Sequence, residues 1–243
     1  MLYFLENKLY RCILIRMLLQ IQEGRIMKID LHVHSSEISP CSFLSVEQLL
    51  ELYSKTDYDG FVITNHFAAG ACKYVQDRGL DFHKEFHETI RKASMLGQKK
   101  GFLVLGGYEV RFAGSDNDYL VYGMTEEHCR DYEKIFAMTP REFGEFAAAE
   151  GFLFYQAHPF RNGMDIVAPE CFFGIEIKNG HPRHDSRNDI AAAWAKKYDL
   201  HAIGGSDCHQ TEDVGSSGII TDCKIENMDD LTAVLAQDAY SIV

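Results

Sequence analysis

Short apolar runs alternate along this chain with longer segments in which apolar residues recur at every third or fourth position. The runs predict buried strands, and the periodic segments predict helices with one buried face. Strands are expected at residues 26–34, 60–64, 102–110, 118–123, 152–156, 174–178 and 201–205. Helices are expected at residues 45–56, 81–99, 139–150, 186–198 and 229–237. This alternation predicts an α/β fold with a mostly parallel sheet.

Two of the expected helices carry clear start signals. Ser45 precedes the first of them, with Gln48 at the capping-box position, and Thr139-Pro140 opens another with proline in its first turn. Between the strand at 60–64 and the helix at 81–99 we expect a polar loop. The number of strands favours a closed or nearly closed barrel over an open sheet.

The chain has no repeat, low-complexity tract or linker, so we expect one domain. Its natural start is Met27, because the segment Met27-Lys28-Ile29-Asp30 begins a strand directly. Residues 1–26 are expected to be an N-terminal extension, and residues 27–243 the domain. The apolar stretch within the extension is interrupted by arginine and is too short to span a bilayer.

The first strand carries the most informative pattern, Asp30-Leu-His32-Val-His34. Side chains alternate between the faces of a strand, so the aspartate and both histidines share one face and the apolar residues share the other. Buried titratable groups need a partner, and the natural partner of paired histidines is a metal ion.

Further ligand-capable side chains stand at the C-terminal ends of nearly all the predicted strands. They are His32, His34, His66, Glu109, His158, His181, Asp207 and His209. In a barrel of parallel strands these ends meet on one face, where active sites are built. The set predicts a metal centre whose ligands suit Zn, Mn or Fe. His83 and His87, four residues apart, are instead expected on a helix face.

Charge and cysteine usage limit the partners and the compartment. A formal net charge of −12 argues against nucleic acid or an anionic membrane surface as the main partner. Seven cysteines without a CxxC pair are typical of reduced thiols, so we expect a cytoplasmic protein.

The chain also resembles a known family, the polymerase and histidinol phosphatase (PHP) superfamily. The matching segments are Asp30-Leu-His32-Val-His34-Ser35, Ile63-Thr64-Asn65-His66, Gly107-Tyr108-Glu109-Val110, Ala157-His158-Pro159-Phe160-Arg161, Glu176-Ile-Lys-Asn179-Gly180 and Gly205-Ser206-Asp207-Cys208-His209. They follow the family's order from about Met27 to the C-terminus. The resemblance implies a small stand-alone phosphoesterase with a distorted (β/α)7 barrel and two or three divalent metal ions, Zn, Mn or Fe.

The resemblance implies a role for each ligand. His32, His34, Glu109 and Asp207 form the catalytic set: the two histidines bind one metal with Asp207, and Glu109 bridges two metals. The remaining ligands are His66 and His209 for a second metal, and His158 with His181 or, as an alternative, His184 for a third.

Two positions depart from the family pattern. The family usually has Asp or His shortly after the HxH motif, where this chain has Glu37-Ile-Ser-Pro40-Cys41. Glu37 is preferred as the substitute ligand because a hard carboxylate suits Mn or Mg as well as Zn, with Cys41 as the alternative. Asn65 stands where the family often has Asp, which weakens a partner of the adjacent histidine.

Phosphate ester hydrolysis needs a nucleophile that is active at neutral pH and relief of charge on the phosphoryl oxygens. A hydroxide that bridges the metals is expected to attack in line, while the metals hold the oxygens. Arg161, just after His158-Pro159, is the best-placed phosphate ligand, and Arg111 and Arg183 are secondary candidates.

The function predicted from the sequence is metal-dependent hydrolysis of a small phosphorylated metabolite, as in histidinol phosphatases or nucleotide phosphatases. The expected partner is that small substrate, with neither nucleic acid nor membrane, and the oligomeric state stays open. Two alternatives are an amidohydrolase-like metal hydrolase, whose sites share HxH and Asp ligands, and a metal-binding regulatory domain without turnover.

Overall fold

The computed structural model describes residues 26–243, so the extension predicted for the first residues of the chain lies almost wholly outside the described residues. The strands are β1 (Met27–Val33), β2 (Gly60–Ile63), β3 (His66–Phe67), β4 (Leu103–Gly106), β5 (Tyr108–Val110), β6 (Tyr119–Tyr122), β7 (Leu153–Gln156), β8 (Gly174–Asn179), β9 (His201–Gly205), β10 (Ile219–Thr221) and β11 (Ser241–Ile242). The α-helices are α2 (Val46–Tyr53), α3 (Ala69–Gln76), α4 (Phe82–Lys100), α5 (Tyr132–Phe136), α6 (Pro140–Glu150), α7 (Asn188–Tyr198) and α8 (Met228–Ala236), and short 3-10 helices lie at Pro169–Cys171 and Thr211–Asp213.

The strands form two sheets. One has the order β11-β10-β1-β2-β4, and the other has the order β3-β5-β6-β7-β8-β9. The predicted α/β class is confirmed, but the predicted closed barrel is not, because the strands do not form one continuous sheet. Only Thr64 and Asn65 separate β2 from β3, and only Gly107 separates β4 from β5, so two stretches of chain run from the first sheet into the second.

The two sheets also meet where β1 and β9 end. Val33 and Cys208 form a parallel bridge, and the backbone N–H of Cys208 donates to the carbonyl oxygen of His32 at 3.1 Å. This close approach requires a glycine at the end of β9, since a Cβ atom on Gly205 would lie 2.4 Å from the Cβ of His32. The residues that follow β9 are therefore held against the histidines of β1.

The sheets are less parallel than the sequence pattern predicted. Strand β6 is antiparallel to both of its neighbours, β5 and β7, and β10 is antiparallel to β1 and β11. The physical reason at β5 and β6 is a short connection without a crossover helix, which can only join antiparallel neighbours. The remaining neighbours, β1–β2–β4, β3–β5 and β7–β8–β9, are parallel.

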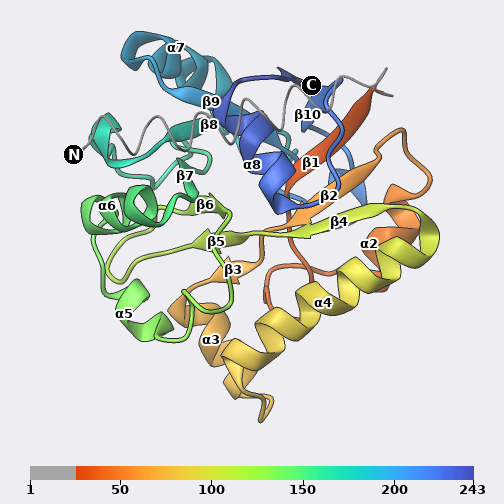
Figure 1. Cartoon of the computed structure of the whole chain (residues 1–243). Helices are drawn as coiled ribbons and strands as arrows, with labels where there is room; N and C mark the ends of the chain where they lie inside the picture. The colour runs from red at the N-terminus through yellow and green to blue at the C-terminus, as the bar shows by residue number, and fades with distance from the viewer. Residues whose placement is uncertain (1–25) are drawn as a thin grey trace.

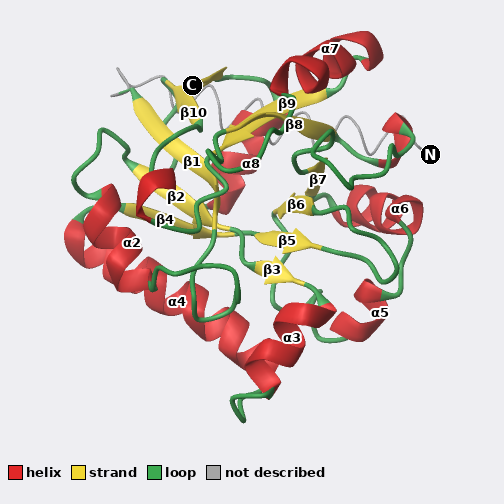
Figure 2. Cartoon of the chain, turned by 180° about the vertical axis from the view of Figure 1, so that it is seen from behind, coloured by secondary structure: helices red, strands yellow, loops and turns green. Residues whose placement is uncertain are grey.

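The helices surround the strands (Figure 2). Figure 1 shows α4 running beside β4, with α2 next to it, and α7 on the opposite side beside β8 and β9. The predicted start of α2 is confirmed: Ser45 Oγ accepts from the backbone N–H of Gln48, and Gln48 Oε1 accepts from the N–H of Ser45. Thr139 and Glu142 form the same capping box at α6.

Helix α3 lies where the sequence predicted a polar loop. The residue before it is Ala68, which supplies no side-chain hydrogen bond to the helix start. Without a capping residue this helix has no start signal in the sequence. Its buried residues Ala71, Cys72 and Val75 pack into the largest core cluster, which also contains Phe67, so tertiary packing stabilises the helix.

In the part of the chain that the structure describes, no helix is both long and apolar enough to span a bilayer.

Candidate metal centre

Strand β1 presents His32 and His34 to a cup formed at the ends of the strands. Both side chains are fully buried. The Nε2 atom of His32 lies 3.0 Å from Glu109 Oε1, and the Nε2 atom of His34 lies 3.4 Å from Glu109 Oε2. Both Nε2 atoms lie 3.5 Å from Asp207 Oδ1. Residues from β1, β5 and the turn after β9 thus meet at one point.

Four atoms in this cup are buried and make no hydrogen bond: Nε2 of His32, Nε2 of His34 and both carboxylate oxygens of Glu109. A buried polar atom without a partner costs free energy on the order of 1–3 kcal/mol. Imidazole nitrogens and carboxylate oxygens that converge without other partners have the chemistry of a divalent metal site. The residues present therefore fit the metal ions that the sequence motifs imply.

Neighbouring side chains orient both imidazoles. The Nδ1 atom of His32 lies 3.0 Å from Glu176 Oε1, and the Nδ1 atom of His34 lies 3.2 Å from Ser39 Oγ. A hydrogen bond at Nδ1 leaves the Nε2 lone pair free for a metal, as is usual for metal-binding histidines. Glu176 was part of the matching motif, but the sequence analysis gave it no role.

A second group of ligand atoms lies beside the first. The Nδ1 atom of His66 lies 2.7 Å from Glu109 Oε2. The Cys41 thiol lies 3.2 Å from the Nε2 atom of His66 and 3.1 Å from the Nε2 atom of His209. The other nitrogen of His209 is held 2.8 Å from the carbonyl oxygen of Asp207.

Glu37, the preferred substitute ligand, lies elsewhere. Its Oε1 atom accepts from the backbone N–H of Val46 at 3.1 Å, at the start of α2, and lies 3.8 Å from Lys92 Nζ. A helix start attracts a carboxylate, because free N–H groups and the helix dipole favour negative charge there. The structure brings Cys41, and not Glu37, to the cluster.

The expected third group is only partly assembled. His158 lies with its Nε2 atom 3.3 Å from Glu109 Oε1 and 3.9 Å from Asp118 Oδ2, while its buried Nδ1 makes no hydrogen bond. Asp118, which was not among the predicted ligands, is 2% exposed. Its only signal was a position at the start of β6, where the alternation is weak. The Nε2 atom of His181 instead accepts from Arg183 Nη2 at 2.9 Å. The ring centroids of His181 and His184 lie 4.7 Å apart.

Each of the three candidate phosphate arginines is paired with a carboxylate. Arg161 Nη2 donates to Asp207 Oδ2 at 2.6 Å. The other two arginines are bidentate: Arg111 binds Asp118 at 2.7 and 2.6 Å, and Arg183 binds Asp213 at 2.6 and 2.7 Å. All three arginines line a pocket of about 310 Å³ together with Glu109, His158 and Asp207.

The buried charges in the cup stabilise one another. Burial opposes a charge on His32, but the nearby carboxylates, Asp207 above all, raise its pKa well above the usual value. Burial equally opposes ionisation of Glu109, but the histidines around it, His66 first, hold its pKa well below the usual value. His34 differs, because burial and the neighbouring His209 lower its pKa and keep it neutral, as a metal ligand must be.

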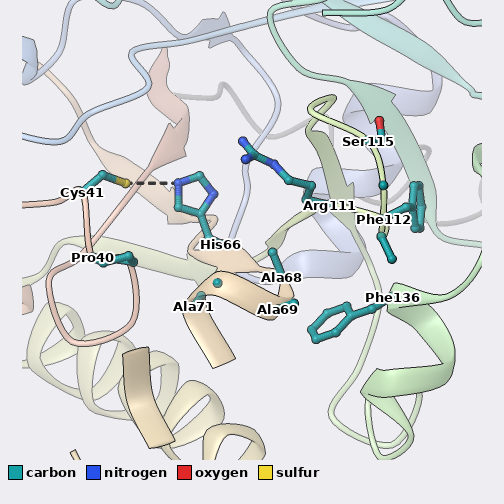
Figure 3. A pocket seen from close by; sticks show the side chains of 13 residues that line it. Pro40, Cys41, His66, Ala68, Ala69, Ala71, Arg111, Phe112, Ser115 and Phe136 are labelled. Carbon is teal, nitrogen blue, oxygen red and sulfur yellow. Dashed lines mark hydrogen bonds between the residues drawn. The ribbon is translucent and has the colours of Figure 1, made fainter. Parts of the chain in front are cut away.

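Cys41 lies between two imidazoles. Burial opposes its ionisation, but hydrogen bonds from His209 and His66 lower the pKa of the thiol to about 6. It also lies on the rim of a second pocket of about 490 Å³, whose other walls are mainly small or apolar residues (Figure 3). These residues are Ala68, Ala69, Gly70, Ala71, Phe112, Ala113, Gly114 and Phe136.

Comparisons with known proteins agree with the sequence motifs. A family model described as PHP-associated matches residues 185–239. No curated protein matches the chain. A two-domain protein from Bacteroides vulgatus, containing a predicted PHP-like metal-dependent phosphoesterase, is similar with a TM-score of 0.66 and 17% identity, over 92% of this chain and 66% of its own. This chain thus spans about two thirds of the length of that protein.

Two other solved proteins share the fold. PsfC from Pseudomonas syringae has a TM-score of 0.66 and 17% identity, over 90% of this chain and 91% of its own. The lesion-specific endonuclease Q from Pyrococcus furiosus has a TM-score of 0.58 and 13% identity, over 90% of this chain and 58% of its own. A further structure of endonuclease Q contains a 27-mer duplex substrate with an abasic lesion at the active site.

The endonuclease Q structures contradict the prediction of a small phosphorylated substrate with nucleic acid excluded as the main partner. The exclusion of nucleic acid rested on the net charge of −12. Net charge averages over the whole surface, whereas the field at an active site is set by the few cations and arginines around it. A similar fold binds a DNA duplex, so the exclusion of nucleic acid was wrong.

Proposed function

We propose that this chain, a PHP superfamily domain by its motifs, its PHP-associated match and its fold, is a metal-dependent phosphoesterase. The observation that carries the proposal is the set of four buried atoms without hydrogen-bond partners, two from histidines and two from Glu109, that face one point. Cations bound among these imidazole and carboxylate atoms would give them the partners that buried polar groups need.

The proposed ligands of the first metal are His32, His34 and Asp207, with Glu109 shared between this metal and a second one. His66 and His209 would hold the second metal, and His158 would contribute to a third. Divalent ions, when bound, lower the pKa of water and neutralise charge on phosphoryl oxygens. Zn, Mn and Fe all suit this mixture of imidazole and carboxylate ligands.

The chain's own residues supply orientation and phosphate binding. Glu176 holds the His32 ring through Nδ1 and also accepts from the backbone N–H of His158 at 2.9 Å, so one carboxylate aligns two proposed ligands. Arg161 is 15% exposed and lines the pocket beside Asp207. We propose that its guanidinium binds a phosphoryl group through two parallel hydrogen bonds.

DNA is the first substrate to test. Endonuclease Q, which shares the fold, acts on a DNA duplex with an abasic lesion. Phe43 supports this choice, because it lines the pocket of the metal centre and is nevertheless 73% exposed. An exposed aromatic ring next to a phosphate site is suited to stacking on an unpaired base.

The test is a substrate panel with the full chain loaded with Zn or Mn. It contains single-stranded DNA, duplex DNA with an abasic site, an aryl phosphodiester, an aryl phosphate monoester and a simple amide. We expect hydrolysis of at least one phosphate ester. A chelator should abolish this hydrolysis, and so should the substitutions His32→Ala and Asp207→Ala. The control His201→Gln lies at the start of β9, away from both pockets, and should retain activity.

Other outcomes decide against the proposal. Ammonia release from the amide without phosphate ester cleavage would favour the amidohydrolase-like alternative. Tight metal binding without turnover on the whole panel would favour a regulatory metal-binding domain. Full activity in both ligand variants would remove these residues from the centre.

A further inference from the structure

Cys41 is the alternative to Glu37 at the position after the HxH motif where the sequence left the ligand open. It lies in the loop between β1 and α2, and its thiol is 3.2 Å from His66 Nε2 and 3.1 Å from His209 Nε2. Figure 3 shows Cys41 pointing toward His66 from one side of the pocket, with Arg111 on the other side of the ring. The thiol thus faces two imidazole nitrogens of the proposed second metal site.

A second observation points to a ligand at the same place. His34 is fully buried, and its Nε2 atom has no hydrogen-bond partner. Ligand atoms of His34, His66 and His209 all lie within 4.8 Å of one another. The centroid of the His34 ring lies 4.5 Å from the ring centroid of His66 and 4.3 Å from that of His209. The thiol therefore contacts two members of a three-histidine cluster whose third member, His34, has a buried nitrogen without a hydrogen-bond partner.

We propose that Cys41 is a thiolate ligand of the metal ion held by His66 and His209. The inference rests on the metal centre of the proposed function and goes beyond it, because it fixes which ion the centre prefers. Thiolate is a soft ligand that selects Zn or Fe over the harder Mn and Mg. Three protein ligands of nitrogen and sulfur type are typical of a zinc site that keeps one position for water or substrate.

The loop geometry supports Cys41 as the ligand, because two other polar residues of the same loop, Glu37 and Ser39, are engaged elsewhere. Glu37 is engaged at the start of α2 by the backbone N–H of Val46. Ser39 is engaged by the Nδ1 atom of His34 and donates to Asn65 Oδ1 at 3.0 Å. Cys41 is exposed at the rim, where an ion that meets substrate has to lie.

The first measurement needs no variant. X-ray absorption at the zinc edge of the full chain loaded with Zn should show a sulfur scatterer at about 2.3 Å, the usual length of a Zn–S bond. A spectrum with nitrogen and oxygen scatterers only would overturn the inference and leave the phosphoesterase proposal standing. Absence of any bound metal would overturn both proposals.

The second measurement compares variants loaded with Co²⁺. We expect a thiolate-to-cobalt charge-transfer band in the wild type, its loss in Cys41→Ser and Cys41→Asp, and its retention in the control Cys223→Ser, which removes a partly exposed free cysteine. Cys41→Asp should also shift preference from Zn toward Mn by at least about tenfold in relative affinity. A band that survives in both Cys41 variants, or an unchanged Zn-to-Mn preference in Cys41→Asp, would overturn the inference.

Discussion

The hydroxyl of Tyr53 donates a 2.6 Å hydrogen bond to Oδ2 of Asp30, and so connects helix α2 to the strand that carries the metal-facing histidines. The other oxygen of Asp30 accepts from the backbone N–H groups of His32 at 3.1 Å and Ser206 at 2.9 Å. One buried carboxylate therefore connects α2, β1 and the segment that follows β9. The position of the cup depends on this junction.

Removing the hydroxyl tests that dependence. Tyr53→Phe leaves a buried carboxylate oxygen without its donor, and we expect a loss of about 1–3 kcal/mol in the free energy of unfolding. The matched control is Tyr122→Phe, whose hydroxyl donates to the neutral carbonyl oxygen of Leu31 at 2.9 Å and should cost about 0.5–1.5 kcal/mol. Urea unfolding measures both variants, and equal losses would contradict a special role for the Asp30 junction.

Glu176→Gln tests the orientation of His32. The variant removes the charge that holds Nδ1 of the imidazole but keeps the size of the side chain. We expect Zn affinity to fall by about 10–100-fold while the fold is kept, because partners of metal-bound histidines act at this scale. Competition with a chelating dye measures the affinity. Glu170→Gln, at an exposed glutamate paired with Arg141, serves as the control and should bind metal like the wild type.

His87 is expected to make the free energy of unfolding depend on pH in mildly acidic solution. Its Nδ1 atom donates to the carbonyl oxygen of His83 at 2.7 Å, and its Nε2 atom lies 3.0 Å from the hydroxyl of Tyr108. Burial lowers the pKa of His87 below the usual value of 6.5. As the pH falls below about 6.5, the unfolded chain binds more protons here than the folded one, so the free energy of unfolding decreases.

His87→Gln should flatten this dependence. At neutral pH the variant should lose about 1–3 kcal/mol in the free energy of unfolding, because the hydrogen bonds of His87 to His83 and Tyr108 are altered. Its free energy of unfolding should nevertheless fall less than that of the wild type between about pH 6.5 and 5.5. Urea unfolding at several pH values measures both slopes, and an imidazole NMR titration gives the pKa directly. Parallel slopes would be evidence against a depressed pKa at this position.

Phe43→Ala tests the proposed stacking contact. A stacked base contributes about 1–3 kcal/mol to single-strand binding, so we expect KM for a DNA substrate to rise by roughly 5–150-fold. The rate on an aryl phosphodiester should change little, because the phosphate ligands remain in place. Tyr198→Ala is the control, since it removes an aromatic ring that is 39% exposed and lies outside both pockets. Equal KM values for DNA in Phe43→Ala and wild type would exclude stacking at this residue.

The sequence was a good guide where local chemistry determines structure. Strand β1 and helix α2 lie where the alternation and the capping residues predicted them. The two histidines of the HxH motif reach the same cluster, because side-chain direction in a strand is fixed by the backbone. These features depend on residues close together in the chain.

The features that the sequence did not predict depend on contacts between distant segments. Glu37 and Cys41 were both suitable ligands, and the choice between them depends on Val46 and Lys92, which engage Glu37. The role of Glu176 depends on the pairing of β8 with β9, which brings its carboxylate within 3.0 Å of His32 Nδ1. The antiparallel pairing of β6 with β5 and β7 likewise depends on neighbours that local pattern does not fix.

The three arginine–carboxylate pairs at the pocket determine how strongly it attracts an anion. Each guanidinium already has its own counter-ion, as Arg161 has in Asp207, so an anion arriving alone meets little uncompensated positive charge. Asp207 divides its two oxygens between partners, because Oδ2 accepts from Arg161 and Oδ1 lies 3.5 Å from Nε2 of both His32 and His34. An anionic reactant would therefore enter a pocket whose guanidinium charges are already compensated, and cations held by the ligand cluster would supply the additional positive charge that attracts it.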